Sequence, residues 1–215
     1  MEKRIAILHT TPATIASLRE LCARLLPGVT VNHFLDDSLL PEINRDGCIS
    51  NSVRERFARL VALAAASGPQ VIMSACSTVG GLLEALRSDS AIPLARIDEP
   101  MACQAAESRG RLIVCATLPS TLGPTLDLIR RKAGPERPID SLLVEGAGAL
   151  LSAGDQEGYL SLIASRLHEA AATHECVVLA QASMAQAAQR LPPEERARLL
   201  TSPESGVAAL KKFVK

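Results

Sequence analysis

The stretch Ile5–Thr14 (IAILHTTPAT) returns later in the chain as Arg111–Thr121 (RLIVCATLPST), and this repeat decides the fold. Both copies are an apolar run that ends in Thr-x-Pro-x-Thr. A second pair, Val71–Thr78 (VIMSACST) and Val177–Met184 (VVLAQASM), echoes the first, and the two members of each pair stand about 106 residues apart. The repeat predicts two related halves, each of which places two strand ends with small polar residues at one shared cleft.

Short apolar runs alternate with longer helical patterns along the 215 residues. Apolar runs without polar alternation are typical of parallel strands buried on both faces. We expect strands near residues 4–8, 29–34, 70–74, 93–96, 111–115, 140–144 and 175–180. We expect helices near residues 12–25, 51–67, 79–88, 98–109, 120–132, 156–172, 184–190 and 204–213. This alternation predicts an α/β fold with parallel sheets covered on both sides by helices.

No long flexible linker interrupts the chain, so the two halves are expected to be compact neighbours. We place the first half at residues 1–97, joined by a C-terminal helix at 204–215 that crosses back to it. The second half is placed at residues 98–203.

The composition excludes several classes of protein. Apolar residues make up 47% of the chain, which argues against disorder. The net charge is zero and there is no Trp, one Tyr and three Phe, so nucleic-acid or membrane-surface binding is not expected. No apolar run approaches the length that crosses a bilayer. A cytoplasmic protein with free thiols is the simplest interpretation.

The six cysteines form no metal-binding pattern, because none lies in a CxxC pair and no histidine stands at zinc-finger spacing. Phosphate-loop, dinucleotide-binding and nucleophile-elbow motifs are absent as well. We therefore expect chemistry without a metal or a cofactor.

Polar residues follow the four repeated strand ends, where ligands bind in parallel α/β sheets. Hydroxyls and helix N-terminal amides suit a carboxylate, although each Ser or Thr taken alone is a candidate helix cap. The candidate substrate-binding residues are Thr10, Thr11, Ser77, Thr78, Thr117, Ser120, Thr121 and Ser183.

Cys76 is the candidate catalytic residue. It leaves its apolar run at a strand-to-helix junction, and a helix N-terminus lowers the pKa of a thiol and favours the reactive thiolate. His9 is a candidate acid, base or anion donor, or a structural histidine. Asp36 and Asp37 either contact the cleft or cap a turn, and Asp98 is placed to reach a strand-end site.

These residues resemble the aspartate/glutamate/hydantoin racemase superfamily, which includes maleate isomerase and arylmalonate decarboxylase. Ser74–Thr78 looks like the first cysteine motif of the superfamily, His9–Thr11 like its first-strand substrate loop, and Thr117–Thr121 like the motif that opens its second half. The resemblance implies two Rossmann-like domains related by a pseudo-twofold, with the active site in the cleft between them and no cofactor. It also implies a pair of cysteines that face the substrate α-carbon from opposite sides.

The chain departs from this pattern at the second cysteine. The repeat aligns Cys76 with Ala182, and a shift by one residue would place Gln181 there instead. Neither residue exchanges a proton as a thiol does, so His9, Gln181 and Ala182 are the candidates at the second face.

We therefore expect a cofactor-independent enzyme that acts on a small carboxylate by proton transfer or nucleophilic attack from Cys76, as a racemase, isomerase, decarboxylase or lyase. The alternative is a non-catalytic protein that binds or senses a small carboxylate. A redox sensor built on Cys76 is weaker, because no resolving cysteine is evident. A homodimer is expected from the resemblance.

Overall fold

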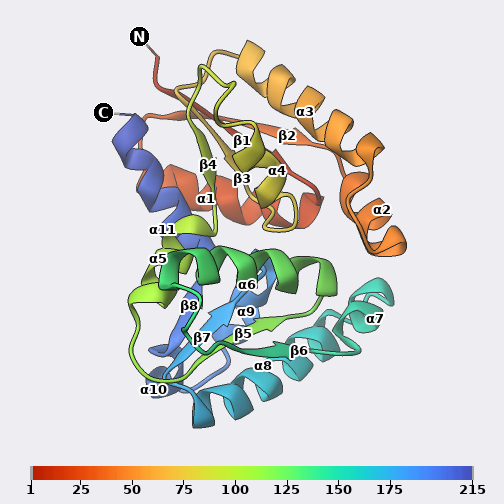
Figure 1. Ribbon diagram of the computed structural model, residues 1–215, viewed down its shortest axis with the longest axis vertical. Helices are drawn as coiled ribbons and strands as arrows, with labels where there is room; N and C mark the ends of the chain where they lie inside the picture. Colours follow the sequence, from red (N-terminus) through yellow and green to blue (C-terminus); the bar gives the residue numbers. More distant parts are fainter. Residues whose placement is uncertain (1, 215) are drawn as a thin grey trace. The chain divides into compact units, whose positions relative to one another are not determined.

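The computed structural model describes residues 2–214. The chain divides into two compact units: unit 1 comprises Met1–Glu99 and Pro203–Lys215, and unit 2 comprises Pro100–Ser202. Within the described part, each unit holds a four-stranded parallel sheet, with strand order β2-β1-β3-β4 in one and β6-β5-β7-β8 in the other (Figure 1). The same order occurs twice, so the sequence repeat corresponds to a repeated topology.

Unit 1 builds its sheet from β1 (Arg4–His9), β2 (Thr30–Leu35), β3 (Val71–Ser74) and β4 (Leu94–Arg96). Its helical elements are η1 (Pro12–Thr14), α1 (Ile15–Leu25), α2 (Leu39–Asp46), α3 (Asn51–Ala66), α4 (Gly80–Ala85), α11 (Ser202–Ala209) and η3 (Leu210–Phe213).

Both faces of this sheet are buried. Successive β1 side chains point to opposite faces, so Ile5 and Ile7 pack with α1 and α11, whereas Ala6 and Leu8 pack with α2, α3 and α4. An apolar run without alternation is what a strand covered on two sides requires.

Unit 2 builds its sheet from β5 (Leu112–Ala116), β6 (Asp140–Leu143), β7 (Cys176–Leu179) and β8 (Leu199–Thr201). Its helical elements are α5 (Glu99–Glu107), α6 (Pro119–Ala133), α7 (Ala147–Ser152), α8 (Gln156–Thr173), η2 (Ala182–Met184), α9 (Ala185–Ala188) and α10 (Pro193–Arg196). Figure 1 shows the strands of this unit lying between α6 and α8. One face of the sheet packs with α5 and α6, and the other with α8 and α9.

The α/β fold with helix-covered parallel sheets is confirmed, but four short elements were not predicted: α2, α7, α10 and β8. Helix α2 contains Pro41, and proline is tolerated there because it stands in the first turn, where its missing N–H has no intrahelical partner. Strand β8 has only three residues, too few to show a pattern.

Candidate active site

The predicted site residues gather at the carboxyl ends of two adjacent strands in each unit. In unit 1 these are β1 and β3, which pair in parallel, and in unit 2 they are β5 and β7. Each unit therefore brings together two of the four polar clusters that the sequence indicated.

Cys76 stands two residues beyond β3 and is partly exposed. Ser74 brackets it: the Ser74 hydroxyl donates to the carbonyl of Cys76 at 3.2 Å and accepts from its amide at 3.4 Å. The helix that follows is shorter and later than expected, since α4 has six residues and begins at Gly80. A turn through Ser77 and Thr78 separates Cys76 from it, so Cys76 does not stand directly at the N-terminus of a helix as the sequence suggested.

The hydroxyl residues beside Cys76 are largely buried. Ser77 is 6% exposed and Thr78 is 3% exposed. At the end of β1, Thr10 is 3% exposed and its Oγ1 atom has no hydrogen-bond partner among the described residues. A buried hydroxyl without a partner within the protein is uncommon in folded proteins. Thr11 instead caps η1, because its hydroxyl accepts from the amide of Ala13.

His9 lies inside unit 1 and both of its ring nitrogens are engaged. Nδ1 lies 3.0 Å from the Thr14 hydroxyl, and Nε2 lies 2.9 Å from Nδ1 of His33. Burial and the neighbouring His33 lower the pKa of His9 to about 4, and burial together with Arg19 lowers the pKa of His33. His9 is therefore neutral near pH 7, and it would have to break one of these contacts to reach a substrate.

The histidine pair was not evident in the sequence. His33 stands on β2, the strand that pairs with the strand of His9. The register places His33 opposite Ile7 and Leu35 opposite His9, so the two histidines are diagonal neighbours. Only the pairing of β1 with β2 brings the two rings together.

In unit 2, Thr117 follows β5, and Ser120 and Thr121 lie in the first turn of α6. Gln181 follows β7, and its Oε1 accepts hydrogen bonds from the Thr117 amide at 2.6 Å and from the Thr117 hydroxyl at 3.0 Å. A backbone amide can only donate, so the oxygen of the carboxamide must face Thr117 and its amino group points elsewhere.

Ser183 lies in η2, where its hydroxyl is 3.3 Å from the phenol oxygen of Tyr159 on α8. Tyr159 is 2% exposed, and it was not among the residues that the sequence indicated. The available signal was that it is the single tyrosine of the chain. A buried phenol needs a hydrogen-bond partner, and here the partner is a predicted site residue.

The two strand ends that carry Cys76 and Gln181 are held by equivalent hydrogen bonds. In unit 1 the amide of Ala75 donates to the carbonyl of Leu8 at 2.9 Å. In unit 2 the amide of Ala180 donates to the carbonyl of Cys115, also at 2.9 Å. Ala75 and Ala180 therefore occupy equivalent positions.

The residue after each alanine is also equivalent, so Cys76 corresponds to Gln181. The alignment of Cys76 with Ala182 is wrong by one residue. The cause is Cys176, which is the first residue of β7 and pairs with Leu112, so the strand begins one residue earlier than the similar letters of the repeat suggested. Backbone pairing, rather than side-chain likeness, fixes the register.

Two other cysteines on strands have the buried character expected of small apolar residues. Burial raises the pKa of Cys115 to about 12 and raises the pKa of Cys176. Neither is a candidate for proton transfer near neutral pH.

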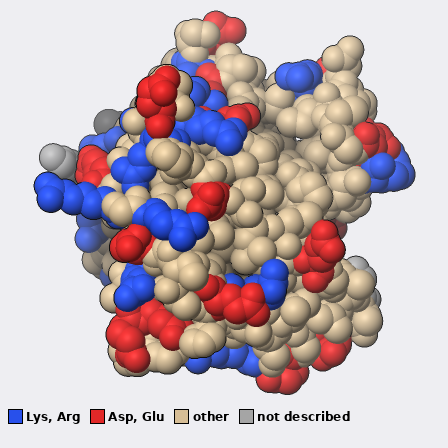
Figure 2. Space-filling model, turned by 60° about the horizontal axis from the view of Figure 1, so that its bottom comes forward, with Lys and Arg blue, Asp and Glu red and all other residues tan. Residues whose placement is uncertain are grey.

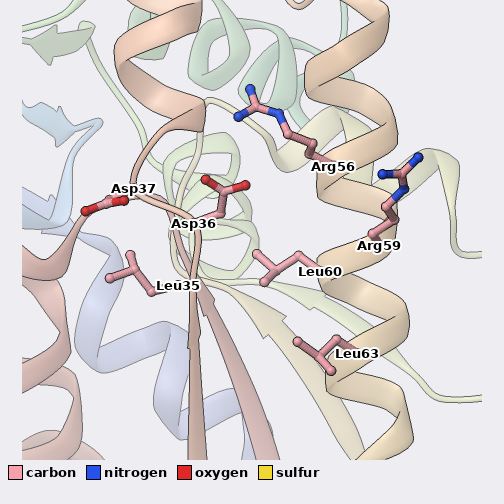
Figure 3. Close-up of a pocket in the computed structure, with 7 residues that line it drawn as sticks. All are labelled: Leu35, Asp36, Asp37, Arg56, Arg59, Leu60 and Leu63. Carbon is pink, nitrogen blue, oxygen red and sulfur yellow. The ribbon is translucent and has the colours of Figure 1, made fainter.

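A separate groove lies in unit 1 between the end of β2 and α3, with a volume of about 370 Å³ (Figure 3). Leucines line its apolar part and charged residues its rim. Its lining residues are Leu35, Asp36, Asp37, Arg56, Arg59, Leu60 and Leu63.

Some charged residues at the rim of this groove are hydrogen-bonded to other residues of unit 1. Asp36 accepts from the amide of Ser38, and Arg56 donates to the Ser38 hydroxyl and pairs with Glu42. Asp36 therefore caps a turn, which was one of the two roles open to it. None of the residues predicted to bind substrate lines this groove.

Basic and acidic side chains are interspersed on the face drawn in Figure 2, without a broad patch of one sign. In residues 2–214, no three His, Cys, Asp or Glu side chains gather as a metal site would require. Over the same residues, no helix combines the length and apolar character needed to cross a membrane.

Solved structures of glutamate, aspartate and allantoin racemases share the fold. The RacE1 glutamate racemase of Bacillus anthracis superposes with a TM-score of 0.75 at 14% identity, covering 98% of this chain and 81% of that one. The aspartate racemase of Picrophilus torridus gives 0.72 at 12% identity, covering 98% and 94%. The allantoin racemase of Klebsiella pneumoniae gives 0.72 at 19% identity, covering 99% and 87%.

No curated protein matches the sequence significantly. The family model described as Asp/Glu/Hydantoin racemase matches residues 5–210, which is nearly the whole chain. With the repeated α/β topology and the strand-end clusters in place, the chain belongs to the Asp/Glu/hydantoin racemase family.

Proposed function

We propose that this protein is a cofactor-independent enzyme of the racemase type that moves a proton at one face of a small carboxylic acid, with Cys76 as the catalytic residue. The observation that carries the proposal is the equivalence of Cys76 and Gln181 in the two copies of the topology. One copy offers a thiol and the other a carboxamide, which neither gains nor loses a proton near neutral pH.

The proposed chemistry is an exchange at the α-carbon. Cys76 as thiolate takes the α-proton, the electron pair delocalises into the carboxylate, and the thiol returns a proton to the same face. If the thiol exchanges its proton with solvent before returning one, the α-carbon receives a proton from solvent and keeps its configuration. The same thiol would protonate a carbanion left by loss of CO₂, so decarboxylation belongs to the same proposal. Isomerisation belongs to it as well, if the thiolate adds to a double bond and leaves again after rotation about the resulting single bond.

Carboxylate binding is assigned to the hydroxyl residues and to the carboxamide of Gln181. Thr10 supports this assignment, because its buried hydroxyl lacks a partner within the described protein. Gln181 supports it because Thr117 fixes its oxygen and leaves its amino group to donate. Hydrogen-bond donors aimed at a developing negative charge often accelerate such reactions more than any other group, by about 10²–10³-fold each. The full proposed set is Thr10, Thr11, Ser77, Thr78, Thr117, Ser120, Thr121, Gln181 and Ser183.

Racemisation needs a second acid at the opposite face. Ala182 is unsuited because it has no exchangeable side-chain proton, and His9 is held by Thr14 and His33. We therefore propose exchange with retention as the wild-type behaviour. A homodimer and a cytoplasmic location are proposed on the family resemblance.

The test is proton NMR in D₂O with a panel of small amino, hydroxy and dicarboxylic acids that includes malonates and maleate. The wild type is compared with Cys76→Ala and with Cys48→Ala, which removes an exposed cysteine as the control. We expect α-deuteration, isomerisation or CO₂ loss that falls by about 10²–10⁴-fold in Cys76→Ala and is unchanged in Cys48→Ala.

Turnover that survives in Cys76→Ala would remove Cys76 from the mechanism. Tight binding of a panel member with no exchange would favour the alternative, a protein that binds or senses a carboxylate and has lost the second proton-transfer residue.

A further inference from the structure

Arg96, the last residue of β4, forms a buried ion pair with Asp98, which stands two residues further on; β4 pairs with β3, the strand that leads to Cys76. Arg96 is 3% exposed and Asp98 is fully buried. The guanidinium donates from Nε to Oδ1 at 2.8 Å and from Nη2 to Oδ2 at 2.7 Å, and its Nη1 lies 3.3 Å from Glu84. Asp98 is thus committed to Arg96 and does not reach a strand-end site, which corrects the sequence expectation.

This clamp fixes the plane of the guanidinium, because two parallel hydrogen bonds allow one orientation. Burial opposes the charge on Arg96, but the contacts with Asp98 and Glu84 outweigh it and raise its pKa. A buried pair of this kind is a poor way to add stability, since well-packed apolar residues often serve as well. Its placement therefore calls for another account.

The flat guanidinium rests against the backbone of Gly80. A Cβ atom on Gly80 would lie 2.3 Å from Cζ, 2.5 Å from Nε and 2.6 Å from Nη2 of Arg96. Real Cβ atoms do not approach this closely, so only glycine fits while Arg96 keeps its place. The adjacent Gly81 has nothing within 4 Å of the corresponding position.

Gly80 closes the loop that begins at Cys76. Its amide donates to the carbonyl of Ser77 at 3.0 Å, and it is the first residue of α4. The other end of the loop is held by Ser74, whose carbonyl accepts from the amide of Ile97, the residue that follows β4. Cys76 therefore lies between two fixed residues. Ser74 is hydrogen-bonded to Ile97, and Gly80 packs against Arg96.

The second copy of the topology supports the link between Arg96 and Gly80. Ladder pairing places Arg96 opposite Ser74 and Thr201 opposite Leu179, so Arg96 corresponds to Thr201. Counting on from the same pair, Gly80 corresponds to Ala185, the first residue of α9. A large clamped side chain goes with glycine in unit 1, and a small side chain goes with alanine in unit 2.

We propose that Arg96, clamped by Asp98, is a positioning residue that sets the conformation of the Cys76 loop through its contact with Gly80. The inference rests on the proposed function for its purpose, but not for its test. Arg96 acts on the thiol through the backbone and is not assigned a contact with substrate.

The test compares Gly80→Ala with the neighbouring Gly81→Ala as the matched control. The rate of Cys76 alkylation by iodoacetamide is followed by peptide mass spectrometry from pH 6 to pH 10, with exposed Cys48 as the internal reference. We expect Gly80→Ala to change the Cys76 rate by about tenfold or to shift its pH profile by about one unit. The alkylation rates of Cys48 in the same sample and of Cys76 in Gly81→Ala should each stay within about twofold of their wild-type values. That is well below the roughly tenfold change that a pKa shift of one unit would give.

Two further variants separate positioning from loss of structure. Arg96→Lys keeps the charge beside Asp98 but removes the planar group, so it should also alter the Cys76 profile. The double variant Gly80→Ala/Arg96→Lys should bring the profile back toward that of Arg96→Lys alone, because the flexible Lys yields to the new methyl group. Unfolding midpoints show which variants are folded.

Folded Gly80→Ala with a wild-type Cys76 profile would overturn the inference, as would an equal effect from Gly81→Ala. If Gly80→Ala does not fold, an unchanged profile in Arg96→Lys would overturn it instead. Alkylation needs no turnover, so absence of exchange in D₂O together with an altered profile would defeat the proposed function alone.

Discussion

The loop after β3 and the loop after β7 occupy the same place in two copies of one topology. They differ in the hydrogen bonds that the strand-end side chains make. In unit 2 the threonine hydroxyl has a partner, because Thr117 donates to the side-chain oxygen of Gln181 from both its amide and its hydroxyl. In unit 1 the equivalent of Thr117 is Thr10, whose hydroxyl is buried without a partner in the described protein, and the equivalent of Gln181 is Cys76.

Under the proposed function, this difference would assign proton transfer to the loop of unit 1, while the loop of unit 2 contributes hydrogen bonds alone. A thiol forms weak hydrogen bonds and transfers protons, whereas a carboxamide forms strong hydrogen bonds and does not. The same backbone geometry would then carry a proton-transferring group in one copy and a hydrogen-bonding group in the other.

The largest expected effect comes from restoring the symmetry of the two loops. If both loops serve one substrate, as the resemblance implies, Gln181→Cys places a thiol at the opposite face and converts exchange with retention into racemisation. Racemisation of whichever acid shows Cys76-dependent exchange should rise by about 10²–10⁴-fold, the usual contribution of a positioned acid or base. Polarimetry or chiral chromatography measures it.

Ala182→Cys is the matched control for this change. It adds the same thiol one residue further on, in η2, and should leave racemisation at the wild-type level. A gain in Ala182→Cys without one in Gln181→Cys would show that the ladder register is not the register of the site.

The fold and the position of Cys76 just beyond a strand end could be predicted from the sequence because they depend on local patterns. The Thr-x-Pro-x-Thr repeat marks β1 and β5, and the break from apolar to polar residues marks Cys76. Both signals are carried by adjacent residues, so no tertiary information is needed to read them.

The finer features of the site depend on contacts that the sequence does not encode locally. Cys76 and Gln181 are equivalent in position because of backbone hydrogen bonds at the strand ends. Similarity between side chains does not reveal these bonds. His33 meets His9 only through the β1–β2 ladder, and Asp98 looked available until its pairing with Arg96 was seen. His33 is remote from His9 in sequence, whereas Arg96 stands only two residues before Asp98, and what the sequence does not show is that the side chains of this ion pair are both buried.

A smaller effect is expected from the histidine pair, which unit 2 lacks because the equivalent of His9 is Ala116 on β5. The pKa of His9 is lowered from 6.5 to about 4, so the unfolded chain takes up a proton at higher pH than the folded one. Stability conferred by the neutral ring is therefore present above pH 6.5 and is lost as the pH falls from 6.5 to 4. The loss is about 3 kcal/mol for a shift of this size.

Urea unfolding at pH 7, 5.5 and 4.5 measures this loss in the wild type and in His9→Asn. The variant has no imidazole at this position, so its unfolding free energy should fall less steeply over the same interval, whatever its value at pH 7. Parallel curves for the two proteins would show that His9 is not held neutral in the folded state.

The smallest expected effect compares the two equivalent threonines directly, by replacing each with valine of nearly the same shape. Thr117→Val removes a hydroxyl that donates to Gln181 at 3.0 Å, and should cost about 1 kcal/mol of unfolding free energy. Thr10→Val removes a buried hydroxyl that lacks a protein partner, so the free protein should be unchanged or about 1 kcal/mol more stable. Urea unfolding of the ligand-free protein gives both values.

Binding of the active acid tests whether the Thr10 hydroxyl contacts the substrate. A weaker Kd in Thr10→Val, with no loss of stability, assigns the hydroxyl to the substrate. Equal destabilisation by the two substitutions would mean that Thr10 is satisfied within the protein and that the two loops do not differ in this respect.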